Sequence, residues 1–475
     1  MEEHILQTQL EEYAPRLYPL HMPGHKRRMA PAPGLPYGWD LTEVAGVDDL
    51  HEAEGILAQA MARTAALWGA DRSWYLVNGS TCGILAAIHA AVPFGGTLLC
   101  ARNCHKSVYH AIQLGHLRPH WLLPPVDPDF GIYGSLPPQA VARALDAHPE
   151  ASCLVLTSPT YEGVLSDLKA IADLCHARNI PLIVDEAHGA HYLPLAERWG
   201  WQGGAVAAGA DLVIQSPHKT LPSLTQTALL HLNGTRIDPA ALEQALDLFE
   251  TSSPSYPLMA SLDGCTGILA ARGEALFEAW RRRLDRFSAA VAPLQGLRVF
   301  CHGADRVENH PTVFAHDPGK LLVNGRGAGY TGAGLAELLR ERFGFETEMS
   351  CGENLLAMTS ICDEETALDR FAAALLALDR RAQAQPAALT LPEPGEARMT
   401  IAQALAAPSE EVRWDEAAGR VAAEYLWAYP PGVPLIVPGE VLDPAMLAAC
   451  RALEAAGPRL RRSRGGAGIV VCRGA

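Results

Sequence analysis

The stretch Ala210-Asp211-Leu212-Val213-Ile214-Gln215-Ser216-Pro217-His218-Lys219-Thr220 decides how this chain is interpreted. Its first five residues are typical of a buried strand, and Lys219 follows that strand with polar neighbours around it. A lysine that is desolvated, or that lies near another cation, has a lowered pKa and becomes a nucleophile toward carbonyl groups. An ordinary lysine in the loop that ends a strand would fit the same short motif. The rest of the chain must decide between these two interpretations.

Composition sets the class of protein. With 475 residues the chain is too long for one core and fits two or three domains. The net charge of −15 disfavours nucleic acid and anionic membranes as partners. The acidic start lacks the pattern of a signal peptide, and no apolar run is long enough to span a membrane. The 11 cysteines form no CxxC pair, which favours reduced thiols and a cytoplasmic enzyme. The histidines near the N-terminus fit no zinc spacing, so we expect no metal site.

Strand-like and helix-like segments alternate along the first half of the chain. The apolar strand-like runs cover residues 74–77, 97–100, 153–157, 180–184 and 210–214, and helix-like runs separate most of them. Continuously apolar strands alternating with helices predict an α/β fold with a mainly parallel sheet. Such sheets bind ligands beyond the carboxyl ends of their strands, where polar residues gather in this sequence.

Three of these strand ends carry complementary chemistry. Ser80 and Thr81 lie in a strand–turn–helix segment, whose exposed helix N–H groups could bind phosphate, although a simple helix cap fits as well. Asp185 follows a strand and could pair with a ring nitrogen, or could only form a turn. Together with Lys219, these residues match a cofactor that has a phosphate, a nitrogen heterocycle and an aldehyde. Pyridoxal phosphate has all three groups.

Two further residues would complete such a site. His105 could stack on one face of the cofactor ring, and the small side chain of Ala187 could pack against the other face. His105 could equally be a residue at a helix start with no ligand. Each alternative is credible alone, but the coincidence of all these features at strand ends, in this order, favours the cofactor site.

The chain resembles the bacterial ornithine/lysine/arginine decarboxylases, which use pyridoxal phosphate and have the aspartate-aminotransferase fold (fold type I). The resemblance covers nearly the whole chain. Its motifs are residues 21–26 (HMPGHK), 77–81 (VNGST), 102–107 (RNCHKS), 216–220 (SPHKT), 251–257 (TSSPSYP), 429–434 (YPPGVP) and 438–440 (PGE). This many motifs in the same order make the resemblance highly specific.

The resemblance implies roles for the matching positions. Lys219 would form the Schiff base, Asp185 would bind the pyridine nitrogen, and His105 would stack on the ring. The other residues that we assign to the cofactor site are Ser80, Thr81, Ser216 and His218 at the phosphate, with Ala187 and His188. Ser252 or Ser253 would reach the phosphate of a neighbouring subunit, so the expected active unit is a homodimer or a larger homo-oligomer.

The sequence departs from the larger relatives at two points. The family motifs begin by residue 21, so we expect the N-terminal receiver-like domain, and decamer assembly through it, to be absent. Glu186 stands where those relatives commonly have serine, which could change the local hydrogen bonding. The predicted units are an arm (1–53), a large cofactor-binding domain (54–295), a small α/β domain (296–382), a linker (383–396) and a C-terminal α+β domain (397–475).

The expected reaction is decarboxylation of arginine, lysine or ornithine to an amine and carbon dioxide, feeding polyamine synthesis. Lys219 and His218 are both candidate proton donors to the product. The candidates for binding the cationic end of the substrate are Glu43, Asp48, Asp49, Glu162 and Glu348. An aminotransferase, an aldolase or lyase of the same fold, and a cofactor-binding regulator are the alternatives. An aminotransferase would need a carboxylate-binding arginine in the small domain, and Arg326, Arg340 and Arg342 match no motif for that role.

Overall fold

The computed structural model describes residues 5–16, 34–44, 46–382, 392–429, 433–455, 459–464 and 466–474. The motif at residues 21–26, most of the predicted linker and residues 430–432 of the C-terminal motif lie outside these ranges. The predicted domain limits stay predictions, and the regions are described below by their sheets.

The large region is built on a seven-stranded sheet with the order β1-β8-β7-β6-β4-β2-β3. Its strands are β1 Arg72–Leu76, β2 Thr97–Ala101, β3 Arg118–Leu122, β4 Leu154–Thr157, β6 Leu182–Glu186, β7 Leu212–Gln215 and β8 Ala228–Leu232. Strands β3, β2, β4, β6 and β7 pair in parallel, and only β8 runs against its two neighbours. The predicted α/β fold with a mainly parallel sheet is therefore confirmed.

Helices cover this sheet and begin where the sequence provides caps. The helices of the region are α2 Ile56–Trp68, α3 Gly79–Ala91, α4 Lys106–Leu114, α5 Pro138–Ala147, α6 Leu168–His176, α7 Ala205–Ala208, α8 Pro217–Thr220 and α9 Pro239–Phe249. At the start of α6, the Asp167 carboxylate accepts a hydrogen bond from Ala170 N at 3.1 Å. At the start of α9, Asp238 accepts from Ala240 N at 3.0 Å, and both contacts satisfy N–H groups that a helix leaves unpaired.

The boundaries of the two strands next to Lys219 differ from the sequence prediction. Asp185 was expected just after a strand, but β6 continues through Asp185 and Glu186 because Asp185 pairs with Thr157 of β4 and Glu186 pairs with Gln215 of β7. The segment after β7 is the one-turn helix α8, with Pro217 at its first position. Proline suits that position because its backbone lacks the N–H that would have no helical partner there.

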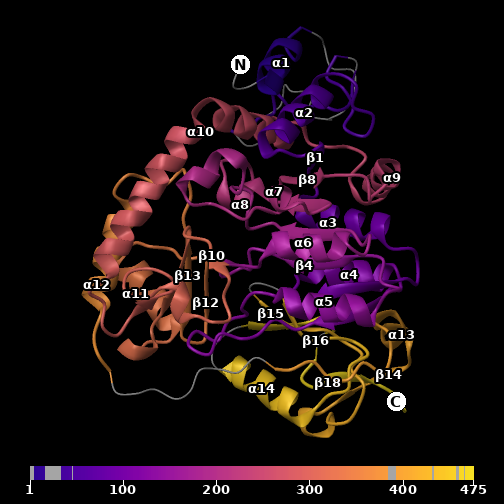
Figure 1. The fold of residues 1–475 in the computed structure, drawn as a ribbon, viewed down its shortest axis with the longest axis vertical. Coiled ribbons are helices and arrows are strands. Elements are labelled where there is room, and N and C mark those ends of the chain that lie inside the picture. The colour runs from indigo at the N-terminus through magenta and orange to yellow at the C-terminus, as the bar shows by residue number, and fades with distance from the viewer. Residues whose placement is uncertain are drawn as a thin grey trace.

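The 36-residue helix α10 Tyr256–Val291 leads from the large sheet to a second, smaller sheet (Figure 1). That sheet has the antiparallel order β12-β13-β11-β9. Its elements are β9 Arg298–Val299, β11 Lys320–Asn324, β12 Met349–Cys351 and β13 Asn354–Met358, with helices α11 Gly332–Phe343 and α12 Ala367–Leu378. Strand β10 Ala315–His316 pairs with β5 Val164–Leu165, so the chain of the small region reaches back to the edge where β4 ends.

The C-terminal region has two small sheets and lies beside the large region (Figure 1). Its elements are α13 Ile401–Ala406, β14 Ser409–Val412, β15 Leu426–Tyr429, β16 Val433–Ile436, α14 Pro444–Ala455, β17 Arg459–Arg462 and β18 Ile469–Cys472. It has an apolar cluster of its own, which includes Leu442, Met446 and Val471. At the other end of the chain, α1 Ile5–Tyr13 packs on α10 and α2, and Leu6 and Leu10 are buried there.

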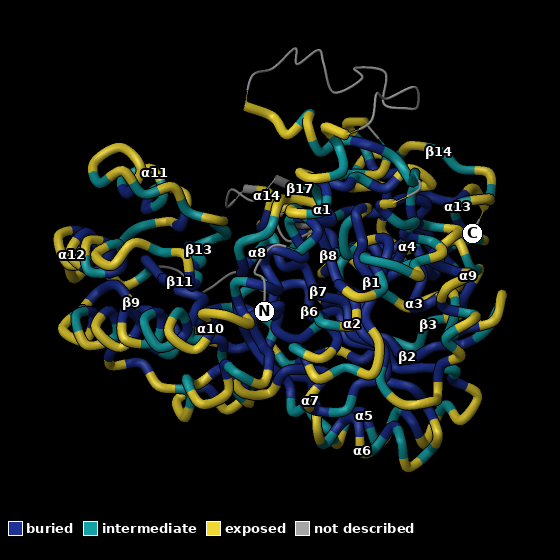
Figure 2. Tube along the Cα trace, turned by 90° about the horizontal axis from the view of Figure 1, so that it is seen from above, coloured by how far each residue is buried: buried dark blue, intermediate teal, exposed yellow. Residues whose placement is uncertain are grey.

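The strands of the large sheet lie in the interior, and the outer helices carry most of the exposed positions (Figure 2). Burial of this apolar surface is the main stabilising contribution to the fold. Within the described ranges, no helix combines the length and the apolar character that a membrane span requires.

Candidate active site

The predicted site residues gather at one edge of the large sheet. His105 lies four residues after β2, Asp185 is the penultimate residue of β6, and Ser216 directly follows β7. The carboxyl ends of parallel strands meet at one edge, which is where open α/β sheets bind ligands. Strand β8 begins at this same edge, and the imidazole of His218 uses its Nδ1 to bond Thr227 O at 2.7 Å.

Lys219 is held by α8 with its amine in this edge region. Its backbone N–H donates to Ser216 O at 3.0 Å, and Nζ lies 3.2 Å from Nε2 of His188. Burial lowers the pKa of the Lys219 amine, and the negative charges of Asp185 and Glu348 oppose that shift. A buried lysine of lowered pKa holds the nucleophilic, unprotonated amine at a lower pH than a solvated lysine does.

Asp185 is a buried carboxylate close enough to Lys219 to interact with it electrostatically. Its Oδ1 accepts a hydrogen bond from Ala187 N at 3.1 Å. Burial raises the pKa of Asp185, while the charge of Lys219 and the Ala187 N–H lower it. A partner with an N–H bearing positive charge would therefore stabilise the ionised carboxylate at this position.

His105 is the N-cap of α4, and its Nδ1 accepts from Ser107 N at 3.3 Å and lies 2.8 Å from the Ser107 hydroxyl. Burial lowers the pKa of His105 to about 3, with further lowering by Lys219 and Lys106. The ring is therefore uncharged in neutral solution. Because Nδ1 accepts, the proton lies on Nε2, and the ring faces are left for stacking.

His188 contacts two lysines at once. Nε2 is the atom near Lys219, and Nδ1 lies 2.8 Å from Nζ of Lys320, the first residue of β11 in the small region. Tyr161 packs edge-on against the imidazole, with 4.8 Å between ring centroids. Burial and the charges of the two lysines hold the pKa of His188 well below its usual value, so the imidazole is neutral. The sequence placed His188 among the cofactor ligands, whereas Lys320 was not predicted at this site.

The residues present fit pyridoxal phosphate in their chemistry. Lys219 offers an amine and Asp185 a buried carboxylate, as that cofactor requires. The hydroxyl of Ser216 is buried next to α8 and has no hydrogen-bond partner among the described residues. Buried polar atoms are nearly always hydrogen-bonded, so an unpaired hydroxyl beside Lys219 is suited to a ligand with acceptor oxygens. Ser80 and Thr81 lie in the first turn of α3, half-buried and exposed respectively.

Ser252 and Ser253 are exposed on the loop between α9 and α10. Glu250, two residues before Ser252, accepts from Val77 N at 3.1 Å and Asn78 N at 3.3 Å, so this loop starts beside the first turn of α3 in the same subunit. A contact of either serine with a neighbouring subunit stays a prediction.

The five candidate acids separate into two groups. Asp48 accepts four backbone N–H bonds, including those of Gly55 at 2.8 Å and Leu57 at 2.9 Å, and thereby caps the segment that begins α2. Asp49 accepts from His51 N at 2.9 Å, and Glu43 lies with Asp48 and Asp49 near Tyr256. The negative charges of Glu348 and Glu162, in contrast, both raise the pKa of the buried Lys320. The charge of Glu348 also raises the pKa of Lys219.

Glu186, which stands where the larger relatives commonly have serine, belongs to a separate buried hydrogen-bond network. Its carboxylate accepts from Ala205 N at 2.8 Å and from Nε2 of Gln215 at 2.7 Å. Gln215 Oε1 is 3.2 Å from Nε2 of His231, and His231 Nδ1 is 2.7 Å from the Ser73 hydroxyl. Burial raises the pKa of Glu186 to about 8, so this side chain is mostly protonated at neutral pH.

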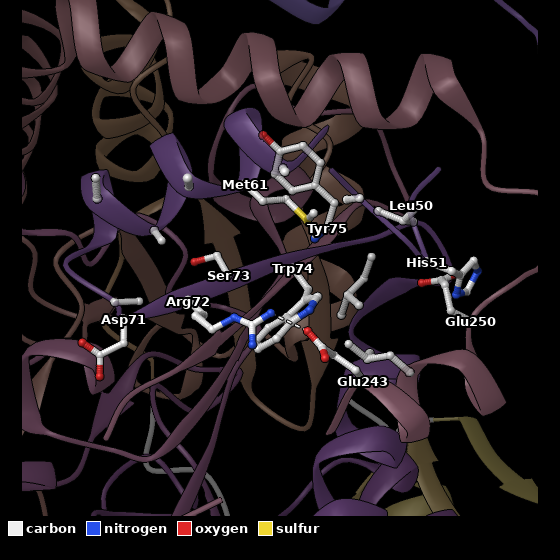
Figure 3. Close-up of a pocket in the computed structure, with 18 residues that line it drawn as sticks. Leu50, His51, Met61, Asp71, Arg72, Ser73, Trp74, Tyr75, Glu243 and Glu250 are labelled. Atoms are coloured by element: carbon white, nitrogen blue, oxygen red, sulfur yellow. Dashed lines mark hydrogen bonds and ion pairs between the residues drawn. The ribbon is translucent and has the colours of Figure 1, made fainter. Parts of the chain in front are cut away.

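A cavity of about 410 Å³ lies elsewhere, between α2, β1 and α9 (Figure 3). Met61, Trp74 and Tyr75 line it, and an ion pair between Arg72 and Glu243 closes one side. None of the predicted site residues lines this cavity. A group of three possible metal ligands, His120, His148 and Glu150, lies at the surface near β3 and is also separate from the site.

Comparison with known proteins gives one consistent result. Residues 36–367 match the major domain of Orn/Lys/Arg decarboxylases, and residues 382–460 match the C-terminal domain of that family. An arginine decarboxylase of Halalkalibacterium halodurans is 33% identical over 454 residues, which is 92% of this chain and 90% of the relative. The structure of the Escherichia coli constitutive lysine decarboxylase superposes with a TM-score of 0.78 at 22% identity, covering 99% of this chain and 82% of that one.

More distant structures support the fold class. Pyridoxamine–pyruvate aminotransferase from Mesorhizobium loti superposes with a TM-score of 0.53 at 16% identity, over 68% of this chain and 83% of the other. The predicted fold-type-I architecture, with its large α/β region and smaller second sheet, is thereby confirmed.

Proposed function

This chain belongs to the Orn/Lys/Arg decarboxylase family, and on that premise we propose that it decarboxylates a basic amino acid with the help of pyridoxal phosphate. The observation that carries the proposal is the meeting of Lys219, Asp185 and His105 at the carboxyl edge of the sheet. Arginine is the first substrate to test, because the arginine decarboxylase relative aligns over nearly its whole length at 33% identity. The product would be agmatine, a precursor suited to polyamine synthesis.

The residues that would hold the cofactor follow from their chemistry. Lys219 would bond its aldehyde carbon, Asp185 would bind the ring nitrogen, and His105 would cover a ring face. The proposed phosphate ligands are Ser80, Thr81, Ser216 and His218. When bound, pyridoxal phosphate supplies a protonated ring that accepts the electron pair left as carbon dioxide departs.

The chain's own groups would tune this chemistry. Asp185 is buried, so its ionised carboxylate is stabilised by a partner with a positively charged N–H group. The carboxylate in turn keeps the ring nitrogen of the cofactor protonated. Neutral His105 adds no positive charge above the ring, so it does not oppose protonation of the nitrogen. Burial lowers the pKa of the Lys219 amine, which favours its roles as nucleophile and later as a proton carrier.

Glu348 is the proposed ligand for the cationic end of the substrate. Its carboxylate accepts a hydrogen bond from the Tyr161 hydroxyl at 2.6 Å, and its charge acts on Lys219. Asp48, in contrast, already accepts four backbone N–H bonds, and Asp49 accepts one from His51 N. Glu348 is the better match for a guanidinium or ammonium group. Its carboxylate lies near the reacting lysine, and backbone N–H groups of the described residues do not compensate the carboxylate's charge.

A homodimer is the proposed active unit. The exposed hydroxyls of Ser252 and Ser253, on a loop that starts beside the first turn of α3, support a contact across subunits. Light scattering of the purified protein would test this assembly, and a strictly monomeric active enzyme would refute it.

The function itself is tested by one assay. The purified chain is mixed with pyridoxal phosphate and, in separate reactions, with arginine, lysine and ornithine, and carbon dioxide and amine are measured. We expect agmatine and carbon dioxide from arginine with the highest kcat/KM. Formation of a keto acid in place of the amine would indicate an aminotransferase, and silence with all three amino acids would refute the decarboxylase proposal.

A further inference from the structure

Two histidines and a glutamate converge at one side of the large sheet, away from the candidate active site. His120 lies in the middle of β3, which ends the strand order of the sheet and pairs with β2. His148 is the C-cap of α5, and Glu150 lies in the loop that leads from α5 to β4. Because α5 packs on β3, the three side chains meet although they come from different elements.

The distances between their polar atoms fit a bound metal ion. Glu150 Oε1 is 3.4 Å from Nδ1 of His148 and 3.6 Å from Nε2 of His120. Both distances exceed the usual length of an N–H···O hydrogen bond, which is about 2.7–3.2 Å. A tetrahedral zinc ion with bonds of about 2.0–2.2 Å holds its ligand atoms roughly 3.4 Å apart. The potential ligand atoms of the three residues therefore have the spacing that such an ion requires.

The donor atoms select a class of metal. Two imidazole nitrogens and one carboxylate oxygen suit Zn²⁺ and similar transition-metal ions, whereas Mg²⁺ and Ca²⁺ prefer oxygen ligands. Burial and the neighbouring His148 lower the pKa of His120, Glu150 opposes that shift, and Arg118 adds to it, so this ring is neutral at pH 7. Arg118 is exposed, and solvent therefore screens its repulsion of a cation.

Binding requires one rearrangement. The rings of His120 and His148 are stacked, with their centroids 3.5 Å apart and an angle of 17° between their planes. A metal ion lies in the plane of each imidazole that binds it, so the rings must turn out of the stack to share one ion. Rotation about the Cβ–Cγ bond has a broad energy minimum and can open this angle. The two side chains are 40% and 30% exposed, so the rings can turn toward solvent.

We propose that His120, His148 and Glu150 form a Zn²⁺ site that fastens the edge strand β3 to the loop after α5. Water is the fourth ligand of the ion, and the metal stabilises this side of the sheet because it binds the folded chain. The expectation of no metal site came from the histidines near the N-terminus, which do not belong to this group. The site is separate from Lys219 and its neighbours, so the inference does not depend on the proposed function.

The test counts the zinc ions that the protein retains. The purified chain is treated with a chelator, loaded with pyridoxal phosphate, mixed with Zn²⁺ and passed through a gel-filtration column, and its zinc is measured by atomic emission. We expect wild type to retain one zinc ion per chain more than His120→Ala or His148→Ala. Glu150→Gln should weaken zinc binding at least about tenfold in competition with a fluorescent chelator.

The matched control is His89→Ala, which removes an exposed histidine of α3 that packs against Phe249. It should retain zinc like wild type. Equal retention by wild type, His120→Ala and His148→Ala would overturn the proposal, and so would an equal loss in His89→Ala. Far-ultraviolet circular dichroism checks that each variant is folded.

Two further measurements identify the ligands and the effect of the ion. Co²⁺ in place of Zn²⁺ should give the visible absorption bands of a tetrahedral site with nitrogen and oxygen ligands, and these bands should disappear in His148→Ala. A thiolate charge-transfer band would place the metal on cysteine and overturn the proposal. Zinc should also raise the melting temperature of wild type and not that of His120→Ala. An equal rise in both proteins, or no rise in wild type, would contradict the proposed link between β3 and the loop.

Discussion

Arg102 and Glu440, 338 positions apart in the sequence, form an ion pair that is buried between the large and C-terminal regions. Arg102 follows β2, and its Nη2 lies 3.3 Å from both carboxylate oxygens of Glu440. Its Nη1 donates to Pro434 O at 2.8 Å and to the Tyr109 hydroxyl at 2.7 Å. Burial raises the pKa of Glu440, and the charge of Arg102 opposes that rise. This pair joins two of the sequence motifs and fixes one region on the other.

Glu440→Gln should destabilise the protein strongly, because it leaves the Arg102 charge buried without a counter-ion. The expected loss of unfolding free energy is about 3 kcal/mol or more, measured by denaturant titration at fixed protein concentration. Glu274→Gln breaks the exposed pair with Arg198 and should cost less than about 1 kcal/mol. Equal, small losses in both variants would contradict a stabilising role for the buried pair.

Glu186 should make stability fall as the pH rises. Its pKa is raised from 4.5 to about 8 in the folded protein, so the folded state binds this proton more tightly than the unfolded state does. As the pH rises from 4.5 to 8, the contribution of Glu186 to the unfolding free energy should therefore decrease, by at most about 1.4 kcal/mol per pH unit. Below pH 4.5 both states are protonated and the effect disappears.

Glu186→Gln should remove that dependence, because an amide cannot ionise and the Gln215 amide can turn to bond it. The measurement is the difference in unfolding free energy between wild type and variant across the same pH range. A difference that does not change with pH would show that Glu186 does not titrate as described.

Glu348→Gln should reduce kcat/KM for arginine roughly tenfold to a hundredfold, the usual worth of one hydrogen bond to a charged group. With norleucine, which has no distal charge, any residual decarboxylation should be equal in the two proteins. Glu346→Gln, two residues away in an exposed position, is the matched control and should behave like wild type. A similar loss with both amino acids would instead mean that Glu348 supports Lys219 and does not bind the distal cation.

The sequence predicted the strand-end positions of Lys219, Asp185 and His105 because apolar strands and polar turns have local patterns. The extension of β6 through Asp185 depends on pairing with β4 and β7, which local pattern does not contain. Lys320 was not predicted at the site, since its contact with His188 depends on how the small region packs. A lysine opening an apolar strand was nevertheless a usable signal, because a lysine is rarely buried without a partner.

The central claim, that Lys219 is the reacting amine, is tested most directly by locating the covalent bond to the cofactor. The protein is loaded with pyridoxal phosphate, reduced with borohydride, digested and mapped by mass spectrometry. The other lysines of the sequence are Lys26, Lys106, Lys169 and Lys320, so the possible sites are few and separable. We predict that the reduced cofactor is found on Lys219 and that Lys219→Ala abolishes the adduct. A specific adduct on Lys320, or one that persists in Lys219→Ala, would contradict the account.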